Sequence, residues 1–330
     1  MKFKKLLPIA FAGLFLVSGC TNLPDSIDSQ TSQQTQITNS HDAKIQVVTS
    51  FYPLAEIANQ VGGTYVEVKN LTPPGAEPHD FEPSPRDVLS LNTADLVMVN
   101  GVGFEPWAEK ILPTLEGNNV KVLDVSKVLP ELLQSVEESE DEASGDTDED
   151  HKEQFKFDPH FWLDPISYIT QVEFVSTTLS EIDPVHSDDF TKQANAFVGQ
   201  LEGLHKEFTD GLSSCKLRVF VTNHAAFGYL AKRYGLTMLP ISGLSPDSEP
   251  SAKRLGELTE LVKKEGVKIV FSESLMSPKV SETLAKEAGV QVMVLNPLEG
   301  LADNEIAAGE NYISVMKKNL QSLRTALECT

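Results

Sequence analysis

Cysteine and positive charge are scarce in this chain, and so are long hydrophobic runs. Three cysteines among 330 residues are too few for a disulfide scaffold or a cysteine-rich zinc domain. Lys and Arg total 27 against 48 Asp and Glu, a formal charge of −21, so a polyanionic partner would be repelled. We therefore expect no binding to nucleic acid. No apolar run reaches the roughly 18 residues that a membrane-spanning helix needs.

The common enzyme signatures are absent as well. The sequence contains no P-loop, no G-x-S-x-G nucleophile elbow and no H-E-x-x-H zinc helix. Asn100-Gly101-Val102-Gly103 follows an expected strand, but Pro106 stands where a dinucleotide-binding fingerprint requires its third glycine. The chemistry of this protein must therefore come from other residues.

The first twenty residues predict export. A basic N-terminal segment with three lysines precedes an apolar stretch at residues 6–17, which is too short to span a bilayer. It closes with Val17-Ser18-Gly19-Cys20, which resembles a bacterial lipobox, a motif whose cysteine is lipidated after cleavage. We expect a signal peptide at residues 1–19 and a lipid anchor at Cys20. The protein would then be held on the outer side of the cell membrane, in the periplasm or at the cell surface.

Residues 20–43 predict a flexible tether. They contain 14 Ser, Thr, Gln or Asn among 24 residues and no periodic apolar pattern. A second polar segment, residues 137–153, includes nine acids between Glu137 and Asp150 and no Lys or Arg there. We interpret it as a disordered acidic insertion, with weak capture of divalent cations as an alternative.

The rest of the chain predicts an α/β fold with two lobes. Short apolar runs alternate with helical segments, which is typical of parallel βα units. The expected strands are residues 45–50, 66–71, 96–100, 120–125, 217–223, 237–241, 267–272 and 290–295. Helices are expected at residues 225–234, 251–265 and 278–288.

A long helix is expected between the two sets of strands. Residues 186–212 carry apolar side chains at steps of three and four, which predicts one helix about 40 Å long. We expect this rigid spine helix to join two lobes, residues 44–185 and 213–330, each with a small parallel sheet flanked by helices.

Seven histidines are the main candidates for function. Four have ordinary explanations as solvated or packed side chains, namely His41, His151, His186 and His205. The other three lie in loops after strands, where open α/β sheets usually bind ligands. These are His79, His160 and His224. Their separations of 81 and 64 residues do not by themselves show that they converge.

Four stretches of the sequence carry a resemblance to a known family. They are P-P-G-A-E-P-H-D-F-E-P-S-P-R-D, D-P-H-F-W-L-D-P, T-N-H-A-A-F-G-Y-L-A-K-R-Y-G-L and L-N-P-L-E-G-L. They resemble the metal-site segments of zinc-uptake lipoproteins, which belong to the cluster A-I (cluster 9) solute-binding proteins of metal ABC importers. The resemblance covers residues 43–328. It implies a non-enzymatic protein that captures Zn²⁺ between its two lobes and delivers it to a membrane permease, and we expect a monomer.

The resemblance also implies a ligand set. His79, His160 and His224 match zinc ligands, and Glu299 matches the fourth ligand of members that use three histidines and one glutamate. Manganese-type relatives have a second carboxylate in place of His224, and other members have Asp where this chain has Asn296. Imidazole suits Zn²⁺, whereas Mn²⁺ prefers more oxygen. Three imidazoles and one carboxylate complete a tetrahedron and leave no position for a substrate.

Other acids near these residues have two candidate roles each. Glu77 and Glu273 are alternatives for the carboxylate ligand, with loop hydrogen bonding as their ordinary role. Asp80, Asp158 and Asp164 are candidates to orient the imidazoles by hydrogen bonds, or simply to cap loops and helices. Because ligand histidines must be neutral, we expect metal affinity to fall below a pH of about 6.5.

Three other functions fit parts of the pattern. A manganese carrier of the same family would need additional oxygen ligands. A three-histidine zinc hydrolase would need water at the fourth position. Whether Glu299 is the fourth ligand therefore distinguishes a carrier from an enzyme. A surface adhesin, a role described for relatives, would bind its partner without the metal site.

Two further cysteines follow Cys20. In an exported protein Cys215 and Cys329 are free to form a disulfide, which would fasten the C-terminal segment to the start of the second lobe. Thiolate ligation of zinc is the weaker alternative, because the four ligands above already complete a site.

Overall fold

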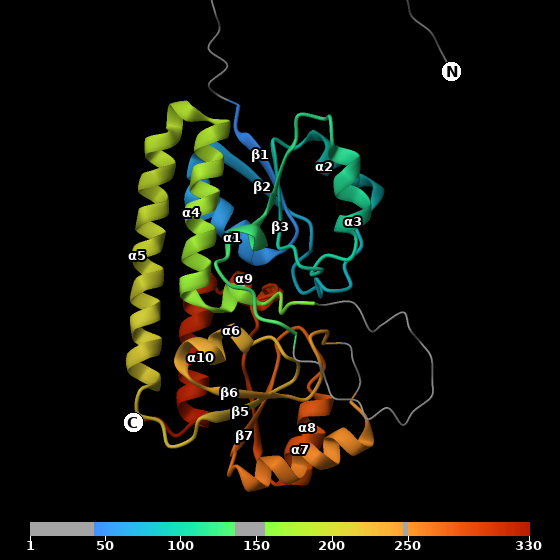
Figure 1. Cartoon of the computed structure of the whole chain (residues 1–330), viewed down its shortest axis with the longest axis vertical. Coiled ribbons are helices and arrows are strands. Elements are labelled where there is room, and N and C mark those ends of the chain that lie inside the picture. The colour runs from blue at the N-terminus through green and yellow to red at the C-terminus, as the bar shows by residue number, and fades with distance from the viewer. Residues whose placement is uncertain (1–42, 136–155, 247–249) are drawn as a thin grey trace, which may run out of the picture. The chain divides into compact units, whose positions relative to one another are not determined.

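Two parallel four-stranded sheets form the frame of the protein (Figure 1). The computed structural model describes residues 43–135, 156–246 and 250–330. The expected signal peptide, the lipidated Cys20, all but the last residue of the tether and the acidic insertion lie outside the described residues. Ala43–Thr330 forms one compact unit.

The first sheet has the strand order β2-β1-β3-β4, and every pairing in it is parallel. All four residues of β3 are buried, as expected for a strand covered on both faces. The register places Val47 opposite Val68 on one side and Leu96 on the other. The strands are β1 Ile45–Thr49, β2 Val66–Asn70, β3 Leu96–Val99 and β4 Lys121–Asp124.

The second sheet repeats this arrangement with the order β6-β5-β7-β8, again entirely parallel. Pro240, which has no N–H to donate, ends the edge strand β6. The strands are β5 Val219–Thr222, β6 Thr237–Pro240, β7 Ile269–Ser272 and β8 Gln291–Val294. All eight strands predicted from the sequence are confirmed, with ends shifted by one or two residues.

Helices cover both faces of each sheet (Figure 1). α2 and α3 pack on the outer face of the first sheet, and α7 and α8 pack on the outer face of the second. The inner faces of both sheets share one hydrophobic core with the remaining long helices. The helices are α1 Tyr52–Gly62, α2 Pro85–Thr93, α3 Ala108–Ile111, α4 Pro165–Ile182, α5 Ser187–Leu212, α6 Gly228–Tyr234, α7 Ala252–Lys264, α8 Lys279–Ala288, α9 Asp303–Ala307 and α10 Tyr312–Ala326. None of these described helices has both the length and the apolar character needed to cross a membrane.

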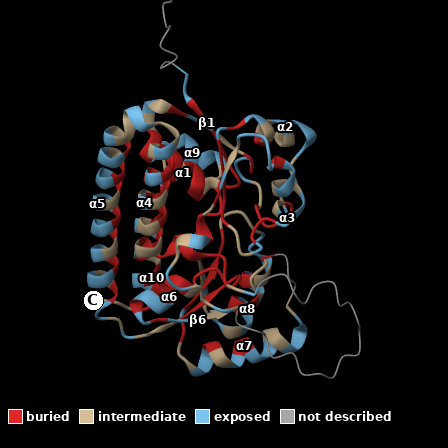
Figure 2. Ribbon diagram, turned by 45° about the horizontal axis from the view of Figure 1, so that its top comes forward, coloured by how far each residue is buried: buried red, intermediate tan, exposed pale blue. Residues whose placement is uncertain are grey.

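The predicted spine helix is present as α5, which begins one residue later than expected. Its inner side is buried and its outer side is exposed (Figure 2). The buried stripe is the one expected from the sequence: Phe190, Ala194, Phe197, Leu201, Leu204, Phe208 and Leu212. α4 runs back along α5, and α10 packs beside both, with Tyr168 of α4 stacked on Tyr312 of α10. The two sheets are thus joined by a layer of three helices, and the predicted lobe bounds at residues 44–185 and 213–330 stay a prediction.

Cys215 and Cys329 form a disulfide, which confirms the pairing expected from the sequence. The backbones of the two cysteines also form an antiparallel bridge, and Leu217 N–H donates to Leu327 C=O beside it. The disulfide therefore fastens the end of α10 to the segment that enters β5.

We predict that Cys329→Ser lowers the free energy of unfolding by about 2–5 kcal/mol, because the bond constrains a long loop in the unfolded chain. Urea denaturation followed by circular dichroism, without reductant, would measure this loss. Cys215→Ser should give the same loss, and the double variant should add little, since all three remove the same bond. An unchanged urea midpoint after reduction of the native chain would contradict the prediction.

Candidate metal centre

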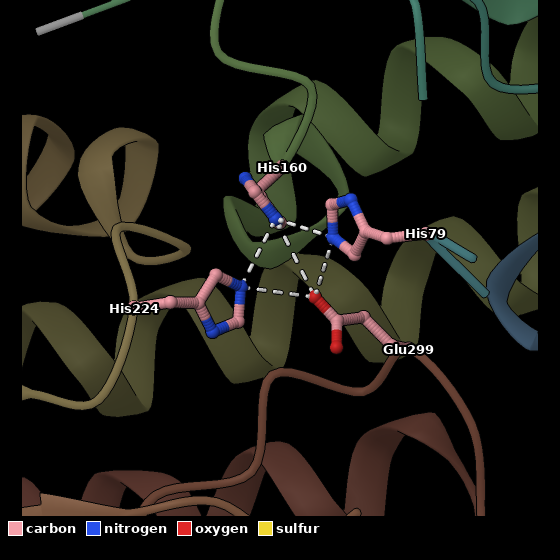
Figure 3. Close-up of side chains that lie close together, drawn as sticks. All are labelled: His79, His160, His224 and Glu299. Atoms are coloured by element: carbon pink, nitrogen blue, oxygen red, sulfur yellow. Dashed lines mark hydrogen bonds and ion pairs between the residues drawn. The ribbon is translucent and has the colours of Figure 1, made fainter. Parts of the chain in front are cut away.

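Four side chains from distant parts of the chain meet at one point (Figure 3). His79 lies in the loop after β2, and His160 lies in the segment that leads into α4. His224 follows β5 closely, and Glu299 lies in the loop after β8. The exposed fraction of each side chain is 1% or less. The three histidines and the glutamate singled out in the sequence therefore converge, a point that their spacing had left open.

Five of the six distances between the potential ligand atoms lie between 3.1 and 3.4 Å, and all four atoms lie within 4.8 Å of one another. Oε1 of Glu299 lies 3.3 Å from Nε2 of His79, 3.4 Å from Nε2 of His160 and 3.1 Å from Nε2 of His224. Nε2 of His160 lies 3.3 Å from that of His79 and 3.2 Å from that of His224. Ligand atoms around a tetrahedral zinc ion, with bonds near 2.05 Å, lie about 3.3 Å apart. These five distances thus match the spacing expected around one four-coordinate ion.

Two of the imidazoles are oriented by carboxylates on the side away from this point. Nδ1–H of His160 donates to Asp158 Oδ1 at 2.8 Å, and the backbone N–H of His160 donates to the same oxygen at 2.9 Å. Nδ1–H of His224 donates to Glu273 Oε2 at 2.7 Å, and its backbone N–H donates to Glu273 Oε1 at 3.0 Å. Such bonds fix the tautomer that directs the Nε2 lone pair inward. Asp158 thus has the orienting position expected from the sequence.

The structure separates the other acids that the sequence suggested. Glu273 lies behind His224 and is not one of the four converging residues. Glu77 accepts the backbone N–H of His79 at 3.1 Å and is also outside the group of four. Burial, followed by repulsion from Glu299, raises the pKa of Glu77 to about 9. Asp80 is exposed to solvent.

Asp164 caps a helix and contacts no histidine ring in the hydrogen bonds that the structure shows for it. Its carboxylate accepts the N–H groups of Ile166 and Ser167 at the start of α4. It also forms a two-pronged ion pair with Arg233 of α6, at 2.9 and 2.6 Å. Asp164 therefore holds the segment that carries His160 against the second half of the protein.

His79 packs against an aromatic side chain. The ring of Phe104 packs against it edge-on, with centroids 4.6 Å apart. Burial is the largest influence on His79 and lowers its pKa. His79 is therefore neutral near pH 7, the state in which an imidazole can bind a metal ion.

The charges of the remaining three residues are strongly coupled. Burial alone would lower the pKa of His160, but hydrogen bonds with Asp158 and Glu299 outweigh it and raise that pKa. Burial likewise acts against the charged form of His224, but attraction to Glu273 and Glu299 raises its pKa well above the usual value. Burial would raise the pKa of Glu299, yet attraction to His224 and hydrogen bonds with the imidazoles hold it well below the usual range. The metal-free centre thus favours the charged forms of the buried Glu299 carboxylate and of the His224 ring.

One supporting residue was missed at the sequence level. Glu105 is buried and accepts hydrogen bonds from the hydroxyl of Ser50 and the backbone N–H of Asn100, both at 2.6 Å. Burial raises the pKa of Glu105 to about 7. The side chain of Asn100 in turn donates to Pro159 C=O, directly before His160, at 2.9 Å. A glutamate in a loop has no local pattern that reveals such a role.

A comparison with protein families identifies the type of protein. Residues 47–326 match the family ZnuA, described as "Zinc-uptake complex component A periplasmic". The chain belongs to the ZnuA family. This membership agrees with the resemblance noted in the sequence.

Two relatives of known name can be aligned with almost the whole chain. The zinc-binding lipoprotein AdcA of Streptococcus pneumoniae serotype 4 is 41% identical over 324 residues, which are 98% of this chain and 61% of that relative. The chain thus spans about three fifths of the length of that relative. The high-affinity zinc uptake system protein ZnuA of Bacillus subtilis is 34% identical over 317 residues, 96% of this chain and 98% of the relative.

A solved structure within the family confirms the fold. The Zn(II)-bound ZnuA-like domain of Streptococcus pneumoniae AdcA superposes with a TM-score of 0.73 at 42% sequence identity. The match covers 87% of this chain and all of that domain. The predicted fold class, two small parallel sheets flanked by helices and joined by a long helix, is therefore confirmed.

For this ZnuA-family protein we predict that Glu273→Gln lowers the pKa of His224. The variant keeps the shape of the side chain but removes the negative charge that most opposes the effect of burial on that ring. Two-dimensional NMR of the ring resonances of the metal-free chain across a pH series would measure the change. Glu282→Gln, which removes an exposed carboxylate from α8, is the control and should leave the titration of His224 unaltered. Equal titration curves in native chain and Glu273→Gln would contradict the prediction.

Proposed function

We propose that this protein is the zinc-binding component of an ABC-type metal importer. It binds one Zn²⁺ ion, its cargo, through His79, His160, His224 and Glu299. The observation that supports this most strongly is the convergence of three Nε2 atoms and one carboxylate oxygen, five of whose six mutual distances are 3.1–3.4 Å. The names of the relatives AdcA and ZnuA point to the same cargo.

We propose a carrier and not an enzyme. A catalytic zinc site keeps one position for water or substrate, whereas four protein ligands close the coordination sphere. Here the fourth position is taken by Glu299, whose oxygen lies among the three imidazoles. Three nitrogen donors also favour Zn²⁺ over Mn²⁺, which prefers oxygen.

The location and partners follow from the same proposal. A lipid on Cys20 holds the protein on the outer side of the cell membrane, and the tether of residues 20–43 lets the folded part reach a permease in that membrane. The protein works as a monomer. The first lobe, residues 44–185, contributes His79 and His160, and the second, residues 213–330, contributes His224 and Glu299.

We predict tight one-to-one binding of Zn²⁺ that Glu299→Ala weakens by more than about 100-fold, beyond the range typical for residues that only support a ligand. Titration of the purified full chain against a chromophoric chelator would measure both affinities. Glu77→Gln is the control, because it alters the neighbouring carboxylate outside the four ligands, and it should change the affinity far less. Tight binding that Glu299→Ala leaves intact would refute the ligand set, and no tight binding would refute zinc carriage.

We further predict that zinc binding releases protons at a pH above the unperturbed histidine value of about 6.5. Zn²⁺ needs the neutral ring of His224, but the pKa of that ring is raised, so its proton persists to higher pH and must be displaced by the metal. Affinity should therefore already decline as the pH falls towards 6.5 from above. Calorimetry in two buffers with different ionisation enthalpies near pH 7.5 would measure the release. An affinity that is flat from about pH 8 to 6.5, with no protons released, would contradict the prediction.

A further inference from the structure

The loop that carries Glu299 is held from behind by a buried asparagine of α10. Asn319 is 2% exposed, and both ends of its amide are used. Its Oδ1 accepts the backbone N–H of Asn296 at 2.9 Å, and its Nδ2 donates to the backbone C=O of Asn296 at 2.7 Å. The side chain thus pairs with the backbone just beyond β8 as a neighbouring strand would.

The side chain of Asn296 closes the loop from within. Its Oδ1 accepts the N–H of Leu298 at 2.8 Å, and its Nδ2 donates to Glu305 Oε1 at 3.0 Å. The second oxygen of Glu305 accepts the N–H of Ala302 at 2.9 Å, on the far side of Glu299. The side chains of Asn296 and Glu305, which are bonded to each other, therefore connect the two ends of the loop.

Leu298, directly before Glu299, has an unfavourable backbone conformation. Its φ is 57°, in the left-handed region that a leucine rarely occupies, and its side chain is fully buried. Such a conformation persists only where surrounding contacts determine it, and the hydrogen bond to Asn296 is one of them. The backbone of the loop is thus held in one shape.

The loop is also fixed relative to a second ligand. Nε1–H of Trp162 donates to Pro297 C=O at 2.8 Å. Trp162 lies two residues after His160, so a single hydrogen bond ties the segment of one ligand to the loop of another. Displacement of this loop would therefore change the distance between Glu299 and His160.

The orientation of the Glu299 carboxylate is the feature on which these constraints bear. Its Oε1 points at the three imidazoles, whereas Oε2 points away from them (Figure 3). Oε2 is buried and has no hydrogen-bond partner among the described residues. No side-chain bond to Oε2 therefore keeps the carboxylate from turning both oxygens to a metal ion. What remains is the backbone of the loop, whose position sets how closely the carboxylate can approach the centre.

We propose that Asn319, acting through Asn296, is a positioning residue that makes Glu299 a one-oxygen ligand and thereby favours four-coordinate Zn²⁺ over Mn²⁺. Carboxylates bind metals through one or both oxygens, and Mn²⁺ gains more from additional oxygen than Zn²⁺ does. This inference rests on the zinc carriage proposed above, and it assigns part of the selectivity to residues that do not touch the metal.

Asn319→Asp is the decisive variant, because it has the same shape but cannot donate to Asn296 C=O and repels that oxygen. We expect its Zn²⁺ affinity to fall about 10- to 100-fold, the usual effect of losing a residue that orients a ligand. The Mn²⁺ affinity should fall much less, so that the ratio of the two affinities falls by about 10-fold or more. With Co²⁺ as a probe, the strong visible bands of a four-coordinate ion should weaken as the carboxylate binds through both oxygens.

Leu320→Ala is the matched control. Leu320 is the next residue of α10 and is buried beside Gly211 of α5, and its apolar side chain cannot form a hydrogen bond to the loop, so the variant removes packing and no hydrogen bond. It should keep the native cobalt spectrum and the native ratio of zinc to manganese affinity. A shift in Leu320→Ala equal to that in Asn319→Asp would reduce the effect to lost stability and overturn the inference.

Glu305→Gln keeps the test valid if Asn319→Asp does not fold. Glu305 is partly exposed at the start of α9, and a glutamine there can accept only one of the two hydrogen bonds from Asn296 and Ala302. We expect a smaller shift in the same direction. Native spectra and ratios in every folded variant, with tight zinc binding by the native chain, would refute this inference alone. Failure of the native chain to bind Zn²⁺ would instead refute the proposed function.

Discussion

The central constraint in this protein is the burial of the Glu299 carboxylate. A charge removed from water needs a partner of opposite sign, and the structure offers the imidazoles of three distant loops. Without metal, attraction between Glu299 and His224 favours the charged form of each, so that the pKa of His224 is raised and that of Glu299 lowered. A divalent cation at the same point would be a stronger partner for the carboxylate. The two sheets are therefore tied together electrostatically in either state.

The repeated strand order gives both halves of the protein the same plan at this point. In the first sheet an acid after β3, Glu105, binds Ser50 at the end of β1. In the second an acid after β7, Glu273, binds His224 after β5. These positions lie at the switch in strand order, where open α/β sheets bind ligands. The first half has a serine at this position, whereas the second half has the imidazole of His224. The two candidate ligands of the first half, His79 and His160, therefore come from other loops.

Features determined by residues close together in the sequence could be predicted, whereas features determined by distant contacts could not. The strands follow from short apolar runs, and α5 follows from one stripe of apolar residues, because neighbours along the chain determine both. His79, His160 and His224 were recognisable as loop residues, but their meeting depends on contacts across 81 and 64 residues. The hold of Glu273 on His224 and of Asn319 on Asn296 likewise depends on tertiary packing. Family resemblance supplied Glu299, which no periodicity singles out.

The wide spacing of the four converging residues has a consequence for biosynthesis. His79 and Glu299 are 220 positions apart, and the segment that follows β8 is needed to complete the centre. A nascent chain still lacking that segment presents at most three imidazoles, without the frame that α10 provides. Contacts so distant in sequence also form late in folding, after slow loop closure. Binding of a metal ion by all four residues would thus report that the segment after β8 has been synthesised and has folded onto the rest of the protein.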